Sequence, residues 1–312
     1  MNRTLAILVL MLGLIASPLF AEPVQAAGNN VAKSLQLGSV HALVYDVSGG
    51  KTIFAKNSEI PVSIASITKL MTAMVVLDAK LPLDEMVTVN SEDRDMLKNT
   101  YSRVRMGSKL SRREMLKLAL MSSENRAASA LGRHYPGGRD AFIKAMNAKA
   151  RALGMHQTRF VDSTGLSSDN VATAQDLVKL VIAANQYPLI REFTTASEHL
   201  AKFRSPRYSL GFYNTNALVR GNNWDIKVSK TGFTNEAGRC LVMLATVDKR
   251  PVVLVLLDSY GKRTPVGDAN RVRKWMETGA AGSVPSAAAR NYERERQAQT
   301  KLTTISAKKN QG

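Results

Sequence analysis

The stretch Ser66-Ile67-Thr68-Lys69-Leu70-Met71-Thr72-Ala73 places a hydroxyl and an amine three residues apart at the start of an apolar run. Apolar residues then recur at helical spacing, which predicts a helix, at Leu70, Met71, Met74, Val75 and Leu77. Residues i and i+3 of a helix are neighbours, so the amine of Lys69 can reach the hydroxyl of Ser66. Near a helix N-terminus, unpaired N–H groups and the macrodipole favour developing negative charge. Ser66 is therefore the candidate nucleophile, and Lys69 is the candidate base.

A lysine is protonated at neutral pH, so Lys69 can act as a base only if its pKa is lowered. Desolvation or a second cation nearby would lower it. The same Ser-x-x-Lys spacing also occurs at Ser259 to Lys262 and at Ser306 to Lys309. The tetrapeptide alone is therefore weak evidence, and the assignment depends on two further motifs nearer the C-terminus.

A second motif, Ser122-Ser123-Glu124-Asn125, lies between two predicted helices. The first helix starts at the capping box Ser111-Arg112-Arg113-Glu114, and the second ends before Pro136. On such a connection the Ser123 hydroxyl and the Asn125 amide could face a cleft together, to relay a proton and hold a substrate amide. The alternative is an ordinary helix cap or turn, because the same residue types favour those positions.

A third motif, Lys230-Thr231-Gly232, ends a predicted strand that starts at Ile226. A cation on a cleft wall can bind a carboxylate and lower the pKa of a neighbouring lysine, and glycine lets a substrate backbone lie close. Taken alone, the motif favours a solvated lysine before a glycine turn.

The rest of the chain predicts strands at both ends and helices in the middle. Strands are expected at residues 42–46, 52–55, 226–229, 240–247 and 252–257, and further helices at 140–153, 174–184 and 271–276. Residues 1–27 have the pattern of a secretory signal peptide, and no later stretch is long and apolar enough to span a membrane. We expect a catalytic domain over residues 28–278 and a basic tail, 279–312, that is disordered or at most a weak helix.

Composition limits the partners. The chain has 43 Lys and Arg against 25 Asp and Glu, a net charge of +18, which in an exported protein suggests anionic envelope polymers or weak electrostatic association with a membrane. The alternative is a solvated basic surface with no dedicated ligand. Aromatic residues make up only 6%, without basic-aromatic interleaving, which argues against nucleic acid. The single Cys240 and four scattered histidines give no ligand cluster, so no metal site is predicted.

Order, spacing and context of the three motifs together resemble the penicillin-recognising serine DD-peptidases, over roughly Val40 to Glu277. The stretches Ser66 to Ala73, Leu120 to Ala127 and Lys230 to Thr234 most resemble the D-alanyl-D-alanine endopeptidases of the penicillin-binding protein 7 type. The resemblance implies an α/β (α+β) fold with a five-stranded antiparallel sheet flanked by helices and a helical subdomain. It also implies a periplasmic enzyme that hydrolyses peptidoglycan cross-links, needs no cofactor and takes β-lactam antibiotics as covalent inhibitors.

The same resemblance implies the residue roles. Ser66 would be acylated by the penultimate D-Ala, Lys69 would be the base, and Ser123 would shuttle a proton to the leaving amine. The substrate-binding residues would be Asn125, Lys230, Thr231, Gly232 and Phe233, with the N–H groups of Ser66 and Phe233 forming the oxyanion hole.

Four alternatives compete with this assignment. A DD-carboxypeptidase uses the same machinery but commonly carries a β-rich extra domain and an amphipathic anchor, and only 35 residues follow Glu277. A class A β-lactamase needs a deacylating glutamate, but between Arg126 and Ser229 only Glu192 and Glu198 occur, neither in a Glu-x-x-Leu-Asn context. No Gly-x-Ser-x-Gly elbow supports a Ser-His-Asp hydrolase. A non-catalytic envelope-binding protein remains open, although the intact motifs argue against it.

Overall fold

The large sheet pairs strands from the N-terminal and C-terminal parts of the chain. The computed structural model describes residues 35–280 and 282–309, so the predicted signal peptide (1–27) lies outside the described residues. Five strands pair in the order β2 (Lys51–Lys56), β1 (Ser39–Asp46), β11 (Arg250–Ser259), β10 (Gly238–Val247) and β9 (Asp225–Thr234), every pair antiparallel. The predicted five-stranded antiparallel sheet is confirmed.

Alternating side chains along β10 separate two cores. Cys240, Val242 and Leu244 face the larger core, which the helical elements cover. Leu241 and Met243 face the smaller core under α9 (Thr264–Thr278). Successive residues of the strand therefore contribute to both layers, which explains the unbroken apolar runs Cys240–Ala245 of β10 and Pro251–Leu257 of β11.

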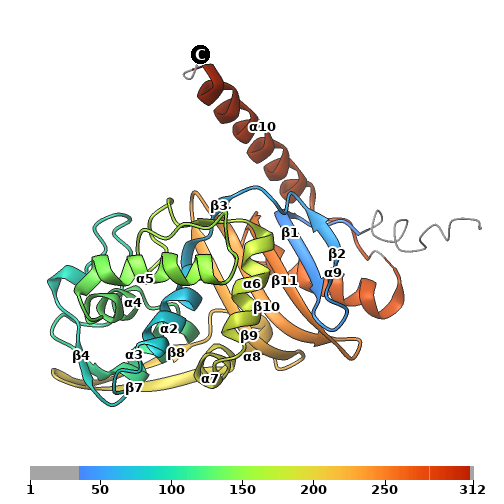
Figure 1. Cartoon of the computed structure of the whole chain (residues 1–312). Coiled ribbons are helices and arrows are strands. Elements are labelled where there is room, and N and C mark those ends of the chain that lie inside the picture. Colours follow the sequence, from blue (N-terminus) through green and yellow to red (C-terminus); the bar gives the residue numbers. More distant parts are fainter. Residues whose placement is uncertain (1–34, 281, 310–312) are drawn as a thin grey trace, which may run out of the picture.

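The helical subdomain surrounds α2 (Thr68–Asp78), in which every residue from Thr68 to Val76 is buried. Around it lie α3 (Arg112–Met121), α4 (Asn125–Arg133), α5 (Gly138–Ala152), α6 (Ala174–Ala184) and α7 (Pro188–Thr195). Figure 1 shows α3, α4 and α5 grouped to one side of the molecule and the large sheet on the other. Helices therefore surround α2, whereas α6 and α7 make the main helical contacts with this face of the sheet.

Short elements complete the fold. They are the 3₁₀ helices η1 (Ala65–Ile67) and η2 (Ser91–Asp93), helix α8 (Ala217–Arg220), and the strand pairs β3 (Val62–Ser63) with β6 (Val171–Ala172), β4 (Met86–Thr88) with β5 (Lys109–Ser111), and β7 (Glu198–Arg204) with β8 (Arg207–Tyr213). The sequence pattern did not predict the β7–β8 hairpin. The apolar alternation that would predict these strands is short, since only Ala201, Phe203 and Phe212 of this hairpin are buried.

The tail contains a helix, α10 (Ala287–Lys309), where disorder or a weak helix was expected. Tyr292 donates a hydrogen bond to Asp258 at 2.6 Å, Arg296 donates to the same carboxylate at 2.7 Å, and Lys56 pairs with Glu293 at 2.9 Å. Figure 1 shows the remainder of α10 projecting from the body. Polar contacts to a distant carboxylate hold the first turns of this helix, and hydrophobic periodicity does not reveal such contacts.

Removal of the Asp268 carboxylate should destabilise the fold. Fully buried Asp268 accepts hydrogen bonds from the N–H groups of Gly38 and Ser39, from the Ser39 hydroxyl and from Arg271, and so ties the start of β1 to α9. Asp268→Ala leaves these donors unpaired and should lower the free energy of unfolding by about 3 kcal/mol. Urea denaturation measures this. The exposed Asp169→Ala is the control and should change stability by less than about 0.5 kcal/mol; equal effects would contradict the account.

Candidate active site

Ser66 and Lys69 meet as their spacing predicts. The Lys69 amine donates hydrogen bonds to Ser66 Oγ at 2.8 Å, to Asn125 Oδ1 at 2.8 Å and to the Thr164 carbonyl oxygen at 2.6 Å. The side chain is fully buried. Burial lowers the pKa of Lys69 to about 7, against the carboxylates of Asp162 and Glu124, which raise it. A large fraction of this amine is therefore neutral at neutral pH and able to accept a proton.

Ser66 lies in a strained turn just ahead of the helix. It belongs to η1, and α2 begins two residues later, at Thr68. Ala65 has a left-handed φ of +46°, which is uncommon for a residue with a Cβ. Ser123 in the second motif has φ +62°. Backbone strain of this kind persists only where the surroundings hold it, and it is concentrated at functional sites.

The loop 162–167 supports the nucleophile, and none of the three sequence motifs includes it. Asp162 accepts hydrogen bonds from the N–H groups of Thr164, Gly165 and Ser167, which directs the Thr164 carbonyl toward Lys69. A Cβ on Gly165 would lie 1.9 Å from the Ala65 carbonyl oxygen. An aspartate followed by Ser-Thr-Gly is a turn signal that could have identified this loop.

The second and third motifs meet on the other side of Ser66. The Lys230 amine donates to Ser123 Oγ at 2.9 Å and to the Thr231 carbonyl oxygen at 2.9 Å. Burial and the nearby charge of Lys69 lower the pKa of Lys230 well below its ordinary value. Two buried lysines thus flank the serine hydroxyls, one from α2 and one from β9.

The remaining predicted residues line the same cleft. Gly232 lets β9 pass close to η1, because a Cβ there would lie 3.0 Å from the Ile64 carbonyl oxygen and 3.1 Å from the Ser66 nitrogen. Phe233 is 47% exposed, and the Arg239 guanidinium stacks on its ring at 3.6 Å. A cavity of about 810 Å³ is lined by Ser66, Ser123, Asn125, Thr231, Gly232 and Phe233, among others.

Two threonines in the site were not found from the sequence. Thr215 shares a hydrogen bond of 2.5 Å with the hydroxyl of Thr231. Thr100 accepts one of 3.0 Å from the Asn125 amide, which leaves the Asn125 oxygen for Lys69. No spacing rule links either threonine to the motifs, so only the folded chain reveals them.

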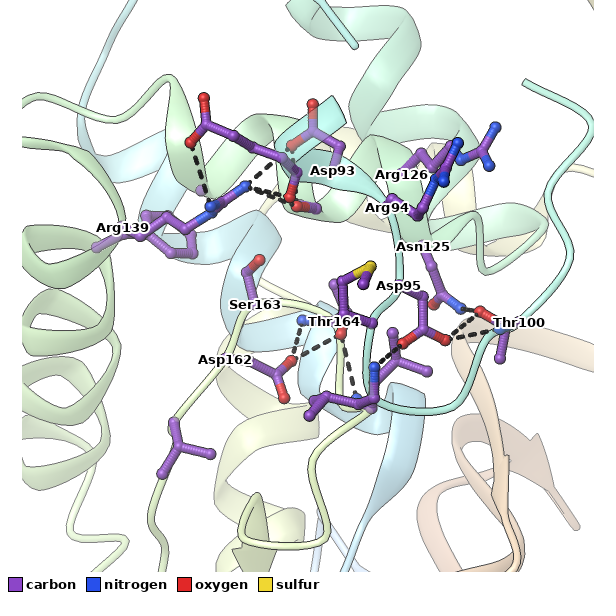
Figure 2. A pocket seen from close by; sticks show the side chains of 18 of the residues that line it. Asp93, Arg94, Asp95, Thr100, Asn125, Arg126, Arg139, Asp162, Ser163 and Thr164 are labelled. Carbon is purple, nitrogen blue, oxygen red and sulfur yellow. Dashed lines mark hydrogen bonds and ion pairs between the residues drawn. The ribbon is translucent and has the colours of Figure 1, made fainter. Parts of the chain in front are cut away.

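A second cavity, of about 390 Å³, adjoins Asn125 and Thr164. Figure 2 shows Asn125 facing Thr100 on one side of it and Asp162 bound to Thr164 on the other. The carboxylates of Asp93, Asp95 and Asp162 in its wall are engaged in internal hydrogen bonds. Neither Ser66 nor Ser123 lines this cavity, so we do not assign the reaction to it.

Other kinds of site have no support in the part of the chain that the structure describes. There, no three His, Cys, Asp or Glu side chains come together as metal ligands. Within the same residues, no helix has the length and apolar character needed to cross a bilayer. The chemistry available is that of a serine hydroxyl beside a lysine amine of lowered pKa, which is nucleophilic acyl transfer.

This arrangement defines the class of protein: a hydrolase, and specifically a penicillin-binding serine peptidase. Residues 28–261 match the family described as Peptidase_S11, D-alanyl-D-alanine carboxypeptidase. Over 288 residues the chain is 52% identical to a D-alanyl-D-alanine endopeptidase of Pseudomonas aeruginosa, with 92% of each chain covered. The chain belongs to the Peptidase_S11 family, which confirms the resemblance seen in the motifs.

Solved structures agree. The Streptomyces K15 DD-transpeptidase superposes with a TM-score of 0.71 at 28% identity, covering 78% of this chain and 97% of that one. Penicillin-binding protein D2 from Listeria monocytogenes, in its ampicillin-bound form, gives a TM-score of 0.66 at 30% identity, covering 78% and 98%.

The pKa of Lys69 should respond to Glu124. The Glu124 carboxylate raises this pKa, so Glu124→Gln, which keeps an oxygen to accept from Ser102 and the Arg126 N–H, should move the midpoint below about 7. NMR titration of the Lys69 side chain measures the midpoint directly. The exposed Glu59→Gln is the control. A midpoint that rises, or that matches the control, would contradict the electrostatic assignment.

Proposed function

We propose that the protein is a periplasmic D-alanyl-D-alanine endopeptidase that hydrolyses peptidoglycan peptide cross-links through an acyl-enzyme at Ser66. The observation that carries the proposal is the 2.8 Å contact between the Ser66 hydroxyl and a buried lysine amine with a pKa of about 7. The 52% identity to a protein named as such an endopeptidase supports the choice of reaction.

The first half-reaction forms the acyl-enzyme. Neutral Lys69 takes the proton of Ser66 as its oxygen attacks the carbonyl carbon of the penultimate D-Ala. The N–H groups of Ser66 and Phe233 stabilise the oxyanion. The bond to the leaving amine then breaks as Ser123 passes to that amine the proton that Lys69 took from Ser66, which leaves Lys69 neutral again for the attack of water. The 2.9 Å contact between Ser123 and Lys230 holds the relaying hydroxyl in place.

Binding residues orient the peptide. Asn125 holds a substrate amide: its oxygen is engaged with Lys69, and its nitrogen, which donates one hydrogen to Thr100, keeps a second one for the substrate. Lys230 and Thr231 bind the carboxylate next to the scissile bond, and Gly232 leaves space for the substrate backbone beside β9. Water then attacks the ester and releases the donor peptide, with no cofactor involved.

β-Lactams should acylate Ser66 by the same route, since the related Listeria protein is described in an ampicillin-bound form. Because Glu192 and Glu198 are the only glutamates between Arg126 and Ser229, a deacylating glutamate of the class A type is absent from this stretch of sequence. The penicilloyl-enzyme should therefore be long-lived. Mass spectrometry of the protein after penicillin removal measures its lifetime, and rapid turnover of penicillin would contradict the proposal.

The domain and compartment assignments are part of the same proposal. We assign residues 1–27 to a signal peptide that directs export, 28–278 to the catalytic domain, and the basic 279–312 to a tail. The net charge of +18 favours binding to the anionic cell-wall polymer and weak electrostatic contact with the membrane surface.

A DD-carboxypeptidase is the second candidate, because the family description names that activity. Purified cross-linked muropeptide dimers and uncross-linked pentapeptides, incubated separately and analysed by mass, distinguish the two. We expect monomers from the dimers without loss of terminal D-Ala from the pentapeptides.

Replacement of the nucleophile provides the control. Ser66→Ala should abolish both dimer cleavage and penicillin labelling, because without the serine oxygen no acyl ester can form. A scaffold protein would keep its cell-wall binding and show no cleavage in either form. Release of D-Ala alone would favour the carboxypeptidase.

A further inference from the structure

The cavity that contains Ser66 extends well beyond the three motifs. Besides Thr231 on β9, its wall includes residues of α8 and of the segment at the start of α9, where Lys262, Arg263, Pro265 and Gly267 line it. Its wall also includes Arg220, at the end of α8, and Arg239, on β10. We call the part lined by Arg220, Arg239, Lys262 and Arg263 the cationic groove.

No carboxylate of the described residues neutralises the charges of the cationic groove. Among the described residues that line the cavity there is no aspartate or glutamate, and none of the four cations is ion-paired with a carboxylate of the described chain. Arg220 donates only to the Asn214 carbonyl oxygen, and Arg239 stacks on Phe233. By contrast, buried carboxylates pair with arginines elsewhere, as in Arg133 with Asp93 and Arg271 with Asp268.

The peptide dipoles of α9 add to the positive potential that the side chains create in the groove. The positive end of the 15-residue helix α9 lies at the groove, where Pro265 and Gly267 form part of the wall. Burial lowers the pKa of Arg239, so its charge is poorly solvated and would gain from an anion. Unpaired guanidinium groups beside a helix N-terminus favour carboxylate ligands.

The direction of the substrate decides which part of it reaches the groove. Resting on the proposed function, Lys230 and Thr231 bind the carboxylate on the leaving-group side of the scissile bond. A carboxypeptidase would release a single D-Ala, which ends there. A cross-link continues instead into a second peptide with its own free carboxylates, and a cavity of about 810 Å³ is larger than one alanine requires.

We propose that the cationic groove binds the carboxylate-bearing acceptor peptide, the strand that leaves when a cross-link is cut, and thereby selects cross-linked substrates. Arg220 and Arg263 are the specificity-determining residues, because both are exposed and line the same cavity as Thr231. Guanidinium groups bind carboxylates in a bidentate manner, whereas a lysine at the same position retains only the charge.

The kinetic experiment uses the double variant Arg220→Ala/Arg263→Ala and the full mature chain. We expect the ratio of dimer cleavage to penicillin acylation, both as second-order rate constants, to fall about tenfold, mainly through KM for the dimer. Arg220→Lys/Arg263→Lys should recover part of this loss. Lys144→Ala/Arg151→Ala removes the same two charges from exposed positions on α5 and controls for general attraction to an anionic substrate.

A chemically modified substrate completes the cycle. With the wild-type protein, amidation of the acceptor carboxylates should lower the rate constant for dimer cleavage about as much as the groove substitutions do. With the groove variant, amidation should lower this rate constant no further, because both changes remove the same interaction. Additive losses, or an equal effect in the α5 control, would overturn the proposal.

Direct binding separates this proposal from the proposed function. Isothermal titration of the uncross-linked stem tetrapeptide into Ser66→Ala protein should give binding that weakens about tenfold with the groove substitutions and with added salt. If this binding is observed while the wild-type protein cuts no dimers, the groove stands and the endopeptidase function fails. If dimers are cut but the groove substitutions change neither the cleavage ratio nor the binding, the function stands and the groove proposal fails.

Discussion

A lysine amine enclosed on every side is the constraint on which this structure depends. Lys69 has no exposed surface and lies within hydrogen-bond distance of Ser66, Asn125 and Thr164, which belong to three separate segments of the chain. A charged amine is costly to bury, so the group is held close to neutrality and its pKa falls to about 7. The helix, the interhelical connection and the loop 162–167 must all be in place before that can happen.

A second buried amine extends the same principle. Lys230 on β9 is enclosed like Lys69, and its partners are the Ser123 hydroxyl and the Thr231 carbonyl oxygen. Burial, and then the nearby charge of Lys69, lower the pKa of Lys230. Lys230 on the edge strand of the sheet thus interacts with Lys69 and Ser123 of the helical subdomain. The catalytic cleft lies where these two parts of the protein meet.

Part of the protein's large positive charge is concentrated in the cationic groove. Many arginines elsewhere in the described chain are paired, for example Arg112 with Glu85 and Arg296 with Asp258, whereas those at the groove are stacked or face solvent. A basic composition alone describes encounter with anionic partners. Unpaired cations in the same cavity as the catalytic serine can also select among substrates, because they bind those that carry carboxylates there.

The sequence by itself determined the three motifs, the buried helix and the five strands, because each has a local signal: Ser66 and Lys69 one helical turn apart, Ser111 and Glu114 as a cap, and the apolar run of β10. Only the tertiary structure decided that Asp162 aims a carbonyl at Lys69, that Thr100 and Thr215 join the site, and that Tyr292 and Arg296 anchor α10 on Asp258. These contacts connect residues 16 to 95 positions apart. Periodicity reports the conformation of neighbours along the chain, whereas such contacts exist only after folding has closed the loops between them.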